Sequence, residues 1–143
     1  MDETLQNRQP EIPCNEVLYR AALNKRHITP SGEVQVDLFL LRPDDEGMLS
    51  VFRKELVPLA TVMAHFRSTK GVVTLLTGLV RDVGSALNRS IDVVPDEIPE
   101  IPGHAVIIGL PDRVQEQAKA EYAASLLRDQ CRLITANERP QGG

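Results

Sequence analysis

One stretch of the sequence decides the fold: Gly103-His104-Ala105-Val106-Ile107-Ile108-Gly109-Leu110-Pro111. Its centre is apolar and largely β-branched, and a glycine stands at each end, which is typical of a strand in the core of a sheet. We predict a buried strand at 105–109, with His104 at its head. The residues expected to be buried on this strand and on a neighbouring one are Val106, Ile107, Ile108, Val73 and Leu75.

The rest of the chain alternates strands with two helices. The pattern predicts strands at 34–41, 48–52, 72–80, 90–94 and 105–109, and helices at 57–68 and 113–130. Residues 16–23 could form a strand or a short helix, and their Val and Tyr favour the strand. Residues 34–38 alternate apolar and polar, as in a half-buried strand, and Gly78 suggests a bulge in the strand at 72–80. Asp112 is placed to cap the last helix, whose expected apolar stripe begins with Val114, Ala118, Tyr122 and Leu126.

These elements define a single compact α+β domain at 14–136. We expect one mixed or mostly antiparallel sheet, with about two helices packed on one face. Residues 1–13 are polar and contain two prolines, so we expect a flexible N-terminal arm. Residues 137–143 are expected to form a disordered tail.

Composition narrows the class of protein. The net charge is −4, aromatic residues are 3% of the chain and no dense basic run occurs, which argues against a nucleic-acid partner. The triplet Lys25-Arg26-His27 is predicted to be a solvated turn. We expect no signal peptide and no membrane span. Cys14 and Cys131 lie far apart in the sequence and are expected to be free thiols, so the prediction is a cytoplasmic protein.

Motifs for a cofactor or a metal are absent. The glycines match neither G-x-G-x-x-G nor G-x-x-x-x-G-K-[ST], and the three histidines show no i, i+4 pairing. The run Asp44-Asp45-Glu46 matches no calcium loop and is expected to be a solvated loop. We therefore predict no cofactor and no metal.

Three polar residues on apolar strands are the candidate site. His104 is a candidate proton carrier, and its alternative is a histidine hydrogen-bonded at the edge of the sheet. Arg20 could hold a phosphate with its fork of N–H donors, and Ser50 could add one hydrogen bond. An arginine on the first strand and a serine on the second resemble ADP-ribosyltransferase-like proteins. That resemblance implies a dinucleotide ligand, although the late strands offer no catalytic glutamate of the kind those proteins carry.

Two classes of function stay open, and the sequence leaves it undecided whether the protein is an enzyme. The first is a small cytosolic binding or accessory module that acts through a protein partner, since no complete catalytic motif is present. The alternative is a small enzyme or ligand-binding protein for a phosphate-bearing ligand. In that case His104 and Ser50 would be catalytic and Arg20 would bind the ligand. The alternative requires these three side chains to meet in one pocket.

Overall fold

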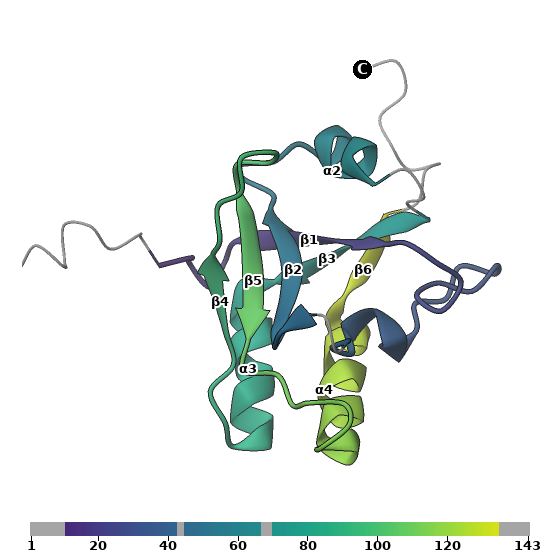
Figure 1. Cartoon of the computed structure of the whole chain (residues 1–143), viewed down its shortest axis with the longest axis vertical. Helices are drawn as coiled ribbons and strands as arrows, with labels where there is room; N and C mark the ends of the chain where they lie inside the picture. The colour runs from purple at the N-terminus through teal and green to yellow at the C-terminus, as the bar shows by residue number, and fades with distance from the viewer. Residues whose placement is uncertain (1–10, 43–44, 67–69, 135–143) are drawn as a thin grey trace, which may run out of the picture.

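The computed structural model describes residues 11–42, 45–66 and 70–134. They form one six-stranded antiparallel sheet in the order β4-β5-β2-β1-β3-β6 (Figure 1). The strands are β1 (Val17–Ala22), β2 (Met48–Arg53), β3 (Gly71–Leu76), β4 (Asp92–Pro95), β5 (His104–Ile108) and β6 (Arg132–Ile134). The predicted α+β class, with a mostly antiparallel sheet, is confirmed.

Helices cover both faces of the sheet. They are the 3-10 helix η1 (Val36–Phe39) and the α-helices α2 (Leu59–His65), α3 (Thr77–Leu87) and α4 (Gln117–Gln130). The helices α3 and α4 lie side by side and pack with η1 over one face, in a core that includes Leu18 and Leu49 (Figure 1). On the other face α2 packs over Tyr19 and Phe52. The prediction of helices on a single face is therefore wrong.

The strand predicted at 105–109 is present as β5, and most of it is buried. Val106 and Ile107 of β5 and Val73 and Leu75 of β3 are all buried, as predicted. Ile108 is only half-buried, because it ends the strand next to Gly109. The prediction that these two strands are neighbours is wrong, because β2 and β1 lie between β5 and β3.

Residues 34–41 do not form the predicted strand. Within η1 the backbone closes local bonds, from Leu38 N–H to the Gln35 carbonyl at 3.1 Å and from Leu40 N–H to the Asp37 carbonyl at 3.3 Å. The four residues from Leu38 to Leu41 are all buried, so the alternation in 34–38 does not continue along the chain. Only the start of the segment pairs, through a single antiparallel bridge of Val34 with Ile28, and burial by α4 and the sheet holds the rest in place.

The predicted strand at 72–80 ends at Leu76, and α3 begins at Thr77. Thr77 turns the chain because its backbone N–H and its hydroxyl both donate to the Glu16 carbonyl, at 3.0 and 2.8 Å. Gly78 forms no bulge. It lies in α3, where an added Cβ would stand 3.0 Å from the Cβ of Cys14, so glycine permits this close approach.

The last helix begins later than predicted and buries another face. Asp112 Oδ1 accepts bonds from the N–H groups of Val114 and Gln115, both at 2.8 Å, but this cap closes a turn that precedes α4. Val114, Ala118 and Tyr122 of the expected stripe are exposed. The buried residues of α4 are Ala120, Ala123, Ala124 and Leu127. Three of these four residues are alanines, so the buried face of α4 consists mainly of small side chains.

Residues 1–10 and 135–143, which include most of the expected arm and the whole expected tail, lie outside the described residues. Ile12, at the end of the expected arm, is fully buried in the core. Cys14 and Cys131 are free thiols, and burial raises the pKa of Cys131 to about 11. Among the helices in the described part of the chain, none is long and apolar enough to cross a membrane.

Candidate functional site

A pocket opens where β1 and β2 separate. These strands pair at only two positions, Leu18 with Arg53 and Tyr19 with Phe52, whereas β1 pairs with β3 along its whole length. The cavity has a volume of about 190 Å³. Its polar lining consists of Arg20, His27, Asp37, Arg42, Asp45 and Ser50. Phe52 and Phe66 supply much of the apolar lining, with their rings 5.9 Å apart in an edge-to-face arrangement.

Arg20 spans the gap between the two strands. Its Nε donates to the Leu38 carbonyl and its Nη1 to the Ser50 carbonyl, both at 2.8 Å, so a side chain replaces the missing backbone pairing. Its Nη2 makes no hydrogen bond to the described residues. Burial lowers the pKa of Arg20 to about 10, the nearby Asp45 carboxylate opposes this shift, and the positive charge of Arg42 adds to it. The guanidinium group stays charged at neutral pH and is held rigidly.

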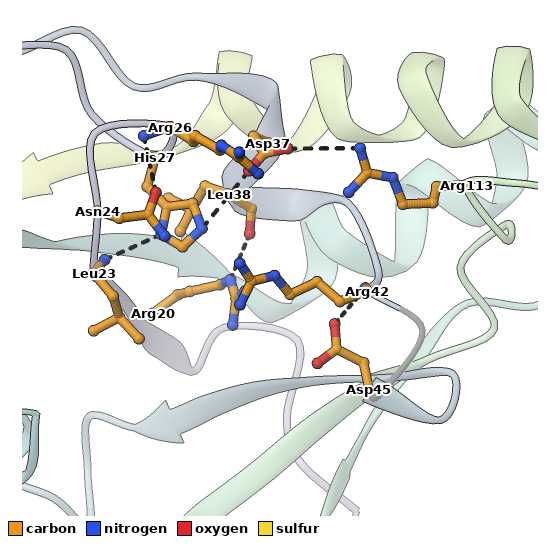
Figure 2. A network of polar contacts seen from close by, with 10 residues as sticks. All are labelled: Arg20, Leu23, Asn24, Arg26, His27, Asp37, Leu38, Arg42, Asp45 and Arg113. Atoms are coloured by element: carbon orange, nitrogen blue, oxygen red, sulfur yellow. Dashed lines mark hydrogen bonds and ion pairs between the residues drawn. The ribbon is translucent and has the colours of Figure 1, made fainter.

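Arg42 brings a second guanidinium group beside the first. Figure 2 shows its side chain reaching back from the segment after η1 toward Arg20. Asp45 is held in this segment, because its Oδ2 accepts the backbone N–H of Arg42 at 2.6 Å. Across the described ranges, neither Arg20 nor Arg42 forms an ion pair with a carboxylate. Within the described ranges, these two adjacent positive charges therefore have no carboxylate at ion-pair distance, although the Asp45 carboxylate offsets part of the charge on Arg20.

His27 forms one wall of the pocket and is buried, whereas Lys25 and Arg26 are exposed. The prediction of a solvated triplet is therefore wrong for His27. Its Nδ1 accepts the backbone N–H of Leu23 at 3.0 Å, which places the proton of the neutral ring on Nε2 (Figure 2). Burial lowers the pKa of His27 and Arg20 lowers it further, while Asp37, whose Oδ2 is 4.0 Å from Nε2, opposes the shift.

This environment predicts that acid destabilises the protein through His27. The folded-state pKa lies below the ordinary value of 6.5, so the unfolded chain takes up the proton first as the pH falls. Stability should fall from about pH 6.5 downward, by at most ~1.4 kcal/mol per pH unit. Urea unfolding at several pH values should show that the free energy of unfolding falls less steeply with decreasing pH for His27→Gln than for the parent protein. Parallel profiles would contradict this assignment.

Arg20 and Ser50, two of the three residues predicted from the sequence, meet in this pocket. Ser50 is exposed, and its hydroxyl makes no hydrogen bond to the described residues. His104 lies elsewhere: it pairs with Phe52 across β5 and β2, with the two rings 5.4 Å apart. Its Nδ1–H donates to the Asp96 carbonyl at 2.8 Å, and Asp96 Oδ2 lies 3.3 Å away. His104 is therefore a buried, hydrogen-bonded histidine outside the pocket.

Sequence reasoning missed Arg42, His27, Asp37 and Asp45. Arg42 and Asp45 fall in a stretch assigned only as a polar loop, and Asp37 in a segment assigned as a strand. Asp37 lies within η1 and its Oδ1 is 3.8 Å from Arg113 Nη2, which partly offsets its charge. Among the described side chains, no three His, Cys, Asp or Glu residues gather as metal ligands.

The fold and the pocket together define an antiparallel α+β domain with an arginine-lined cavity. No family model, no curated protein and no solved structure matches this chain.

Proposed function

We propose that this protein binds a small anionic ligand, one bearing a phosphate or a carboxylate, in the pocket between β1 and β2. The observation that carries the proposal is the pair of guanidinium groups of Arg20 and Arg42, neither of which has a carboxylate partner among the described residues. Two adjacent like charges repel each other, and an anion between them relieves that repulsion. Arginine also offers N–H groups in the fork that matches phosphate and carboxylate oxygens.

The size of the cavity limits what enters it. A volume of about 190 Å³ is below the ~300–1,000 Å³ of pockets that enclose drug-sized ligands. The ligand is therefore a small compound, or the anionic end of a larger one such as a dinucleotide. Phe52 and Phe66 would contact its apolar part.

We assign the pocket a role in binding rather than in catalysis. Ser50 supplies a hydroxyl at the pocket, but His104, the candidate proton carrier, is separated from it by the ring of Phe52. A proton carrier must come within hydrogen-bond reach of the reacting group. The role of Arg20 as the ligand-binding residue is the part of the sequence-based hypothesis that this geometry supports.

Calorimetric titration with inorganic phosphate, NAD, a simple nucleotide and malonate tests the proposal. At least one should bind, and Arg42→Gln should weaken binding by roughly tenfold to a hundredfold, because a charge-assisted hydrogen bond contributes about 1.5–3 kcal/mol. Arg20→Lys should also weaken binding, since lysine keeps the charge but not the fork. Arg128→Gln is the matched control: it removes one positive charge from an exposed site on α4 and should leave binding unchanged.

Absence of heat with every ligand, or equal affinities of the parent and Arg42→Gln, would refute the anion-binding proposal. The alternative proposal would then be an accessory module that acts through a protein partner. A cytosolic location goes with both proposals and is supported by the two free cysteines.

A further inference from the structure

The donors around the pocket come from separate segments and point to a particular shape of anion. Arg20 lies on β1, Ser50 on β2, Arg42 in the segment after η1, and His27 in the turn after β1. Each has at least one N–H or O–H group without a hydrogen-bond partner among the described residues. A carboxylate is planar and has two oxygens, whereas a phosphate or sulfate group presents several oxygens in a tetrahedral arrangement.

His27 is the informative member of this set. The side chain is 8% exposed, and its tautomer is fixed because the Leu23 N–H occupies Nδ1. Nε2 therefore carries a hydrogen, yet the nearest carboxylate oxygen, Asp37 Oδ2, is 4.0 Å away, too far for a hydrogen bond. Nε2 is not among the fully buried polar atoms without a partner in the described residues, so it is open to the cavity, where a ligand or a water molecule can accept its hydrogen.

The balance of charge around the pocket favours an anionic ligand. Two guanidinium groups face the cavity, and Asp37 and Asp45 oppose them. Asp37 is drawn toward Arg113 on its far side, and Asp45 toward the backbone N–H of Arg42 (Figure 2). Because Arg113 offsets Asp37, the positive charges of Arg20 and Arg42 face one remaining negative charge among the described residues, that of Asp45, and the balance favours an anion.

We infer that the ligand of this pocket carries a tetrahedral oxyanion, and that His27 binds it as an uncharged donor through Nε2–H, alongside Arg20, Arg42 and Ser50. The inference rests on the proposed function and narrows it to phosphate-like groups. His27 is a specificity-determining residue in this scheme. Its hydrogen bond reaches an oxygen that a planar carboxylate does not present.

Sulfate and malonate test the shape of the ligand, because both carry two negative charges near neutral pH. Their affinities can be measured by following backbone amide signals in ¹⁵N NMR titrations, which detect weak binding. The parent protein should bind sulfate about tenfold more tightly than malonate, the effect of about one hydrogen bond. The same titrations with inorganic phosphate and with glycerol phosphate compare a free anion with its ester. Tighter binding of the ester indicates an organic ligand and equal binding indicates the free anion, and both support a tetrahedral group.

Two variants at one position test His27 itself. His27→Leu removes both the acceptor for the Leu23 N–H and the donor at Nε2, whereas His27→Gln keeps a side-chain amide with one acceptor oxygen and two N–H donors. His27→Leu should bind sulfate several-fold to tenfold more weakly than His27→Gln, with malonate affinity equal in the two. Equal sulfate affinities of the two variants would overturn the role of His27. Should both variants unfold, the comparison of sulfate with malonate in the parent still decides the ligand class.

The outcomes also separate this inference from the proposed function. If malonate binds the parent as tightly as sulfate and Arg42→Gln weakens both, the pocket binds anions but does not select a tetrahedral one. The further inference would then be wrong and the proposed function would stand. If neither anion nor any phosphate ester binds, both are wrong.

Discussion

Substitution Ile107→Ala is expected to lower the free energy of unfolding by about 2–5 kcal/mol, the usual cost of truncating a buried isoleucine. Ile107 is fully buried in β5, between Leu49 of β2 and Val93 of β4. These neighbours are themselves at most 1% exposed, so the core has little room to close the cavity that the truncated side chain would leave. Urea unfolding followed by circular dichroism measures the loss.

Val114→Ala is the matched control for Ile107→Ala. Val114 is 77% exposed and precedes α4, so removing two of its methyl groups should change stability by no more than about 0.5 kcal/mol. An Ile107→Ala protein that unfolds at the same urea concentration as the parent would show that β5 is not part of the core.

Substitution Glu16→Ala is expected to destabilise the protein by about 3–5 kcal/mol. Glu16 is a buried carboxylate bound by two hydrogen bonds from Arg53, Nε to Oε2 at 2.6 Å and Nη2 to Oε1 at 2.9 Å. The Arg53 side chain is only 16% exposed, so loss of Glu16 leaves a largely buried charge without its partner. The pair also joins the residue before β1 to the end of β2, at the end of the paired stretch that lies away from the pocket.

A double-variant cycle isolates this pair. Because Arg53→Met removes the stranded charge, Glu16→Ala should cost much less in that background than in the parent. The exposed Glu100→Ala removes the same charge elsewhere and should be close to neutral. Equal costs of Glu16→Ala in both backgrounds would mean that the ion pair does not account for the loss.

Local composition predicted the strands well where burial and β-propensity agree. Val17 to Tyr19, Met48 to Phe52 and Ala105 to Ile108 all lie in strands, as their apolar and β-branched content indicates. Residues 77–80 also carry leucine and valine, but they form the start of α3. A short apolar run is compatible with a strand or with a buried helix, and here the two bonds from Thr77 to the Glu16 carbonyl decide between them.

The site was predictable only in part. Arg20 and Ser50 stood out because polar side chains on apolar strands are uncommon, and both line the pocket. Their meeting depends on the early separation of β1 and β2, which no periodicity in the sequence encodes. Arg42 and His27 had no local signal, since a polar loop and a basic triplet usually face solvent. Their positions follow from the way η1 folds back over the sheet.

A crystal structure grown or soaked with inorganic phosphate, at a concentration above its dissociation constant, would show whether the two arginines bind an anion. We expect density for one anion within hydrogen-bond distance of the guanidinium groups of Arg20 and Arg42. The bonds from Arg20 to the Leu38 and Ser50 carbonyls should be unchanged, because they already hold the side chain in place. An empty pocket under those conditions, or an anion bound only at exposed lysines such as Lys25 and Lys70, would contradict the proposed function.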